Sequence, residues 1–192
     1  MKEIILIGGG GHCKSVIDVI EQEGLYKIVG IIDKHELLGK DILGYSVIGT
    51  DSNLKVLAKK HKNALITVGQ IKSSDLRKKL FKLAFEAGFS FPTIASPRSY
   101  ISRHAKIGQG SVVMHNALIN AQAIVGSNCI INTNALIEHD SIIGDFCHIS
   151  TNAVVNGGVT IGTGVFFGSC SSTKEGIVIS ENAFINAGSF IK

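Results

Sequence analysis

The first part of the chain alternates between short apolar runs and amphipathic stretches. Ile4 to Ile7 is a continuous apolar run that ends in glycines, which is typical of a buried parallel strand. Residues 12–23 then carry apolar side chains at helical spacing. Because this alternation continues to the prolines near residue 98, we expect a small, Rossmann-like α/β domain over residues 1–98. Its further expected elements are strands at 27–33 and 64–68 and helices at 51–61 and 73–88.

From Ile101 the apolar pattern changes to a period of six. Every sixth residue from Ile101 to Ile191 is Ile, Val or Phe, and Thr173 is the single exception. Most residues four places after each of these are small. An α-helix has about 3.6 residues per turn and cannot keep every sixth residue on one face. A solenoid of short strands joined by regular corners can do so.

The corner residues of the hexads fit such a solenoid. The fourth position is mostly Asn or Gly, the residues that best tolerate positive φ. Asn116, Asn134 and Asn152 are 18 residues apart, so we expect them to stack one per coil. Cys129 and Cys147 have the same separation at inward positions, which favours two small stacked core residues over a disulfide in a reducing compartment.

This hexad pattern resembles that of the hexapeptide-repeat acyltransferases. The resemblance covers the second half of the chain. It implies a left-handed parallel β-helix with three faces per coil over residues 99–192. In that geometry the first and fifth positions point inward, and the third and fourth positions turn the corner.

Composition and charge narrow the range of partners. A net charge of +4 fits small anionic ligands better than a nucleic-acid surface. The four apolar residues that follow Glu3 are too few for a signal peptide or a membrane span. The four cysteines show no CxxC spacing, so neither a metal site nor a disulfide framework is expected. We therefore expect a cytoplasmic protein without metal, membrane or nucleic acid as partner.

A histidine beside a carboxylate stands out at one predicted corner. His139 precedes Asp140 and lies outside the apolar column. An imidazole next to a carboxylate can act as a general base near neutral pH; a corner histidine without a role is the alternative. Gly157 follows one coil later, so its uncrowded amide is expected directly above His139, where it could bind an oxyanion.

The surrounding residues strengthen this interpretation. The stretches 136–140 and 143–150 resemble the active site of bacterial sugar acetyltransferases that modify sialic acids or the 4-amino group of nucleotide-linked deoxy sugars. Taken alone, His148 would be a solvent-exposed strand residue near the same edge as His139. The resemblance implies His139 as the general base, Asp140 as its support, the Gly157 amide on the thioester oxygen, and acetyl-CoA contacts at His148 and Gly168.

The glycine-rich loop at residues 8–11 is a second candidate site. It follows a strand and opens a helix, where free amides favour phosphate. It is not a full dinucleotide fingerprint, because Cys13 takes the third glycine position. Asp33 could hold a ribose or uracil or serve in a turn; Lys14 and Arg77 are candidate phosphate partners or ordinary surface charges. The resemblance implies sugar-nucleotide contacts at Gly10, Gly11, His12 and Asp33, and Gly69 falls at the same sheet edge.

Together these features predict an acetyl-CoA-dependent acetyltransferase acting on the amino group of a nucleotide-linked amino sugar, in surface glycan biosynthesis. The resemblance further implies a homotrimer with acetyl-CoA between neighbouring β-helices. One alternative is an O-acetyltransferase for sialic or legionaminic-type acids, to which residues 149–157 and 167–170 look closer. Another is a non-catalytic sugar-nucleotide-binding scaffold. A γ-type carbonic anhydrase is disfavoured, since His115, His139 and His148 lack the zinc-ligand spacing.

Overall fold

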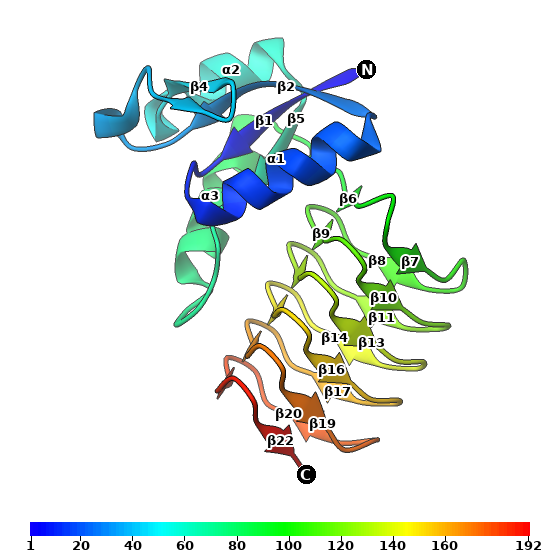
Figure 1. Ribbon diagram of the computed structural model, residues 1–192. Coiled ribbons are helices and arrows are strands. Elements are labelled where there is room, and N and C mark those ends of the chain that lie inside the picture. Colours follow the sequence, from blue (N-terminus) through cyan, green and yellow to red (C-terminus); the bar gives the residue numbers. More distant parts are fainter. The chain divides into compact units, whose positions relative to one another are not determined.

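The computed structural model describes residues 1–192, which form two compact units (Figure 1). The first unit comprises Met1–Gly69 and Asp75–Pro92. The second comprises Gln70–Ser74 and Thr93–Lys192. None of the helices combines the length and the apolar character that crossing a bilayer requires.

The first unit is built on a five-stranded sheet with the order β3-β4-β2-β1-β5. Strand β1, Lys2–Ile7, lies between parallel neighbours, β2 (Tyr26–Ile32) and β5 (Asn63–Ile66). Its apolar run is fully buried, as expected of a central parallel strand. Beyond β2, β4 (Tyr45–Gly49) runs parallel and β3 (Asp41–Ile42) antiparallel. These last two strands were not expected, since glycines divide this stretch into short pieces.

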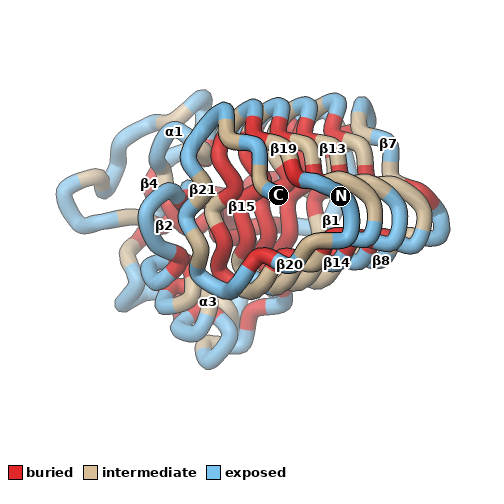
Figure 2. Tube along the Cα trace, turned by 90° about the horizontal axis from the view of Figure 1, so that it is seen from below, coloured by how far each residue is buried: buried red, intermediate tan, exposed pale blue.

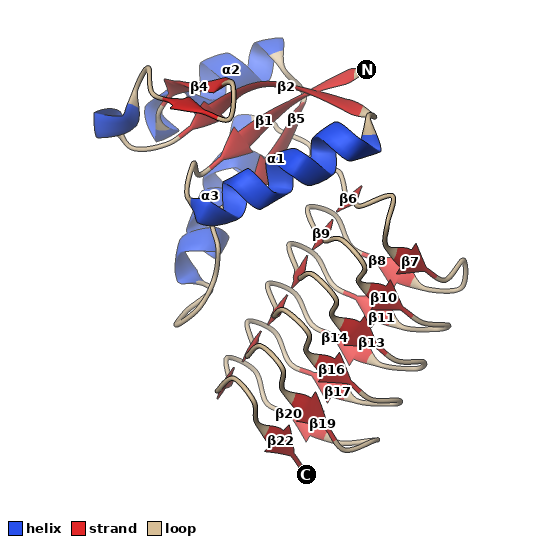
Figure 3. Cartoon of the chain, viewed as in Figure 1, coloured by secondary structure: helices blue, strands red, loops and turns tan.

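Helices accompany this sheet (Figure 3), and three of them are α-helices. Helix α1, Gly11–Glu23, follows β1 directly and buries one apolar face. It ends at Gly24, whose left-handed backbone (φ 68°) lets its N–H donate to the carbonyl of Ile20. The other two helices are α2, Leu54–Lys60, and α3, Asp75–Ala87. The alternation of strands and helices expected from the sequence is therefore present.

The second unit is a left-handed parallel β-helix. Each coil contributes one two-residue strand to each of three sheets, and the coil length of 18 residues appears in the register, where Leu118 pairs with Leu136 and Leu136 with Val154. One sheet contains β7 (Tyr100–Ile101), β10 (Leu118–Ile119), β13 (Leu136–Ile137), β16 (Val154–Val155), β19 (Ser172–Thr173) and β22 (Phe190–Ile191). The second contains β8 (Lys106–Ile107), β11 (Ile124–Val125), β14 (Ile142–Ile143), β17 (Thr160–Ile161) and β20 (Val178–Ile179). The third contains β6 (Ile94–Ala95), β9 (Val112–Val113), β12 (Ile130–Ile131), β15 (His148–Ile149), β18 (Phe166–Phe167) and β21 (Phe184–Ile185).

The period of six is thus the length of one side of the coil. The side chains of the first-position residues point inward and stack into a buried column along the β-helix. They contribute to the repeating buried bands in Figure 2. Cys129 and Cys147 lie in this core as free thiols. Thr173 keeps its place in the column and is fully buried, so the repeat continues through it without an insertion.

The corners depend on left-handed backbone. Every fourth-position residue from Gly110 to Gly188 has positive φ, including Asn134 (58°) and Asp140 (60°). Glycine adopts this conformation freely, and Asn and Asp adopt it more easily than other residues with a side chain. The predominance of Asn and Gly at this position therefore follows from the geometry of the turn.

Candidate functional site

The β-helix presents an imidazole–carboxylate pair at the corner that follows β13. His139 and Asp140 occupy the third and fourth positions, and both side chains are more than half exposed (62% and 56%). Nδ1 of His139 lies 2.8 Å from Oδ2 of Asp140. Since a carboxylate only accepts, Nδ1 carries the proton, and Nε2 is left as the basic nitrogen of the neutral ring.

The two carboxylates at this corner raise the pKa of His139. The hydrogen bond to Asp140 is the main cause; the charges of Asp140 and Glu138 add to it, and partial desolvation opposes it. A raised pKa makes the neutral imidazole a stronger base toward the proton of a nucleophile. The corner therefore has the chemical character of a general base.

Gly157 lies against the ring of His139, one coil further along. A Cβ atom on Gly157 would come within 2.9 Å of Cε1 and 3.0 Å of Nε2 of the imidazole. No larger residue fits without moving the ring. The coil thus brings residues 139 and 157 together, as the 18-residue spacing predicts.

The N–H of Gly157 differs from its equivalents at three other corners. At these three corners the preceding side chain accepts the third-position N–H; Asn120 Oδ1, for example, accepts from Ala121 at 2.7 Å, and Glu138 Oε2 accepts from His139 at 3.3 Å. Asn156 is instead turned to Thr173, where its Nδ2 donates to the carbonyl oxygen. The Gly157 N–H therefore stays available to an oxyanion beside the imidazole.

His148 is placed differently from the sequence expectation. It begins β15, half a coil from His139, so the two side chains belong to opposite sides of the coil and do not share an edge. Its side chain is buried rather than exposed, because the segment Gln70–Ser74 covers it within the second unit. Nδ1 donates to the carbonyl of Gln70 at 2.7 Å, and Asn132 Nδ2 lies 3.0 Å from Nε2. The position of Gln70, 78 residues away in sequence, could not be foreseen from the repeat.

Gly168 has a packing reason for being glycine. Its N–H donates to the carbonyl of Ile185, and a Cβ atom would come within 2.6 Å of backbone atoms in the next coil. It follows β18 and thus belongs to the corner after the His148 sheet, away from His139 and Gly157. The chain therefore holds the four residues predicted to contact the acetyl donor in two separate places, His139 with Gly157 and His148 with Gly168.

The first unit contains a cavity of about 580 Å³ at the carboxyl ends of its strands. Gly10, Asp33 and Gly69 line it, which brings three of the predicted sugar-nucleotide residues together. Gly10 has open space where a Cβ would be, so a ligand can approach its backbone closely. Gly11 and His12 form the first turn of α1 and are not among the lining residues; the Cβ of His12 lies 3.5 Å from the Cβ position of Gly69.

Asp33 ties two loops of this cavity together. Its Oδ2 accepts the N–H of Gly9, and its Oδ1 accepts the N–H of Lys34 at 2.7 Å. Both carboxylate oxygens thus have a backbone partner, and each retains a further lone pair for a ligand hydroxyl. These two bonds give Asp33 a structural role, and its predicted contact with a nucleotide stays a prediction.

Comparison with known proteins places the chain in a family. Residues 3–83 match the PglD N-terminal domain, and residues 104–139 match the bacterial transferase hexapeptide with six repeats. The acetyltransferase domain of PglB from Neisseria gonorrhoeae FA1090 is similar over 100% of this chain and 92% of its own, with 30% sequence identity and a TM-score of 0.91. The chain belongs to the hexapeptide-repeat sugar acetyltransferases. No curated protein sequence matches it.

Two further structures of such acetyltransferases are similar to the chain. PerB from Caulobacter crescentus, solved with CoA and GDP-perosamine, has 29% identity and a TM-score of 0.92, covering 100% of this chain and 89% of that one. The same N. gonorrhoeae domain in complex with acetyl coenzyme A has 30% identity and a TM-score of 0.89, covering 99% and 92%.

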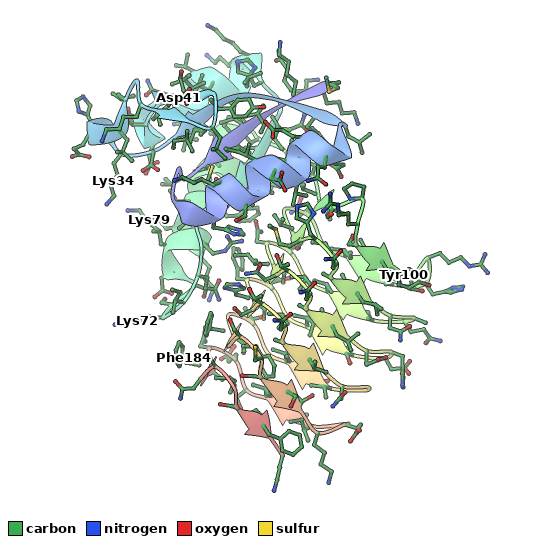
Figure 4. All side chains as sticks on the ribbon, viewed as in Figure 1. Lys34, Asp41, Lys72, Lys79, Tyr100 and Phe184 are labelled. Carbon is green, nitrogen blue, oxygen red and sulfur yellow. The ribbon has the colours of Figure 1, made fainter.

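The structure of this acetyltransferase adds residues that the sequence did not single out. Glu138 is half-buried beside His139 and accepts a hydrogen bond from Asn120 Nδ2 at 2.7 Å. The 18-residue spacing of Asn120 and Glu138 was the sequence signal that places these two side chains next to each other in adjacent coils. Around the cavity, Lys34 and Lys79 add positive charge from a loop and from α3 (Figure 4).

Arg77 is not the surface charge that its sequence position favours. It is 1% exposed, and its Nη1 donates to the carbonyls of Ile66 and Val68 at the end of β5. The carbonyl oxygens accept hydrogen bonds from the guanidinium, which offsets part of the free-energy cost of burying its charge. Arg77 therefore connects α3 to the sheet and is not one of the residues that line the cavity.

Proposed function

We propose that this acetyltransferase transfers the acetyl group of acetyl-CoA to the amino group of a nucleotide-linked amino sugar. One observation carries the chemistry: a carboxylate-paired imidazole in contact with a glycine whose N–H is not used within the chain. These are the two groups that direct acyl transfer needs, a base for the nucleophile and a donor for the oxyanion.

In the proposed reaction, Nε2 of His139 accepts a proton as the amine nitrogen attacks the thioester carbon. Asp140 holds the imidazole in the productive tautomer and stabilises the imidazolium that forms. The N–H of Gly157 donates to the carbonyl oxygen as it becomes an oxyanion. The C–S bond then breaks, and the thiolate of CoA leaves with the proton that His139 holds.

Glu138 favours an amine over a hydroxyl as the acceptor. A neutral amine that attacks through its lone pair carries two N–H groups, and His139 can accept only one of them. Glu138, whose carboxylate adjoins the base, offers an acceptor for the second. A hydroxyl has no second proton to donate. The relatives also support this choice, since PerB was solved with GDP-perosamine and CoA.

The cavity of the first unit is proposed to hold the nucleotide. Gly10, Asp33 and Gly69 line it together with Lys34 and Lys79, a combination suited to a ribose and a diphosphate. Gly11 and His12 would then contribute through the first turn of α1, whose N-terminal amides are turned to the same end of the sheet.

We further propose that the protein acts as a cytoplasmic homotrimer. The separation of His139 and Gly157 from His148 and Gly168 supports a neighbouring copy, because a second protomer could supply the missing pair to one acetyl-CoA. The exposed apolar side chains of Ile124, Ile142 and Val178 give a surface to cover. A monomeric mass in solution would contradict the trimer, and recovery outside the cytoplasm on cell fractionation would contradict the location.

The test of the proposed function is thiol release from acetyl-CoA with paired acceptors. We expect turnover with a nucleotide-linked amino sugar and little with the same sugar carrying a hydroxyl, or with a free sialic-type acid. His139→Ala should lower kcat by roughly a hundredfold or more, with an unchanged melting temperature because the side chain is exposed. Turnover only on the sialic-type acid would reject the amine, and an unchanged kcat in His139→Ala would reject the base.

A further inference from the structure

Thr173 is the one polar residue in the apolar first-position column. It lies in β19, one coil above Val155, and is fully buried. Valine has nearly the same shape and would satisfy the pattern that every other coil follows. A buried hydroxyl is retained at little cost only where it makes a hydrogen bond, so the partner of Thr173 is informative.

That partner is the backbone of Asn156, where the regular ladder is interrupted. From Ser102 to Lys174, all second-position N–H groups except that of Asn156 donate to the carbonyl of the first-position residue one coil later. Asn120, for example, donates to Ile137 and Glu138 donates to Val155, both at 2.9 Å. Asn156 N–H donates instead to Oγ1 of Thr173, at 2.9 Å. Consistently, Val154 pairs with Ser172 but the pairing does not extend to Val155 and Thr173.

The exchange leaves the carbonyl of Thr173 without its usual donor. Nδ2 of Asn156 takes that place, which turns the Asn156 side chain toward Thr173. In the coil of Asn120, where the ladder is regular, the Asn side chain accepts the N–H of the next residue, Ala121. The irregular ladder at Thr173 thus coincides with an Asn156 side chain that is turned away from the N–H of Gly157.

We propose that Thr173 is a positioning residue for acetyl transfer: by diverting the Asn156 side chain, it keeps the Gly157 N–H free for the oxyanion. The inference rests on the proposed function, in which Gly157 stabilises the oxyanion beside His139. It assigns a reason to the single break in the repeat. Thr173 itself touches neither the thioester nor the base.

Thr173→Val is the direct test. It removes Oγ1 while keeping the shape, so we expect the ladder to become regular and Asn156 Oδ1 to accept the Gly157 N–H. Covering one oxyanion donor should lower kcat by about tenfold or more. KM for both substrates and the pH midpoint set by His139 should stay close to the wild-type values. The melting temperature should stay the same or rise. Thr93→Val is the matched control: it also removes a hydroxyl bonded to a backbone group, the carbonyl of Gly108, but away from the imidazole corner, and it should retain wild-type kcat.

Two companion variants separate positioning from a purely structural role. Thr173→Ser keeps the hydroxyl and should retain most of the wild-type kcat. Adding Asn156→Ala to Thr173→Val removes the side chain that covers the amide, and kcat should recover from the single variant. A wild-type kcat in Thr173→Val would contradict the inference. So would a kcat of Thr173→Ser as low as that of Thr173→Val, together with no recovery of kcat in the double variant.

A crystal structure of Thr173→Val makes the outcome independent of turnover. Asn156 Oδ1 within hydrogen-bonding distance of the Gly157 nitrogen would support the inference, and an unchanged Asn156 side chain would overturn it. If wild-type protein acetylates no amino sugar while the variant structure shows the expected bond, the proposed function fails but the control of the Gly157 amide by Thr173 stands.

Discussion

At the scale of single residues, the candidate site depends on contacts between neighbours in adjacent coils. The imidazole of His139 lies between the carboxylate of Asp140 and the bare backbone of Gly157. Since the pair is exposed, its effect is chemical rather than stabilising: Asp140 fixes the tautomer and raises the basicity of the ring.

Replacing Asp140 should therefore change the pH dependence of catalysis. His139 acts as a base only when neutral, so kcat/KM falls as the pH drops through its raised pKa. Asp140→Asn removes the main cause of that raised pKa, and the acidic limb should move to lower pH. We also expect the plateau to fall by about tenfold or more, because the tautomer is no longer fixed.

The measurement is a pH profile of kcat/KM for wild type and variant. Glu175→Gln is the control. It replaces an exposed carboxylate two coils beyond His139 at the same corner, and it should leave the pH midpoint unchanged. An acidic limb that stays in place in Asp140→Asn would show that another group titrates.

At the scale of elements, the coil corner is the unit that repeats. Each corner needs one residue of left-handed backbone. From Asn128 to Gly188 the N–H of this residue donates to a carbonyl one coil before; Asn134, for example, donates to His115 at 3.0 Å. Residues at this position are mostly exposed, so the backbone conformation rather than side-chain packing selects their type.

Asn134→Ala should consequently destabilise the β-helix although no buried side chain is lost. Alanine in left-handed backbone costs about 1 kcal/mol more than in an ordinary turn. Asn134→Gly adopts the conformation freely and should be closer to wild type. Chemical unfolding monitored by circular dichroism would measure both variants; equal stability of the two would mean that the backbone angle does not determine the residue.

At the scale of the whole molecule, the two compact units divide the tasks. The cavity of the first unit is lined by residues of that unit alone, and the imidazole corner belongs to the second. Changes that weaken nucleotide binding should therefore leave the interaction with acetyl-CoA unchanged. The sequence predicted both units, because each has its own apolar period.

Lys79→Ala tests this division. Lys79 is exposed at the cavity, and its loss should raise KM for the sugar nucleotide by about threefold to tenfold, a modest effect because water screens the charge. KM for acetyl-CoA should not change. Lys82→Ala, on the same helix outside the cavity, is the matched control. Equal increases in both KM values would contradict the assignment of the cavity.

The sequence by itself determined the winding of the β-helix, because only a coil with sides of six residues keeps Ile137, Val155 and their equivalents inside. That winding also determined that residues 139 and 157 meet. Only the tertiary structure decided the hydrogen bonds: the cover of Gln70 over His148, the burial of Arg77 and the diversion of Asn156 by Thr173. Each of these contacts depends on where a second segment of the chain lies in the folded protein. A linear pattern of apolar residues carries no such information.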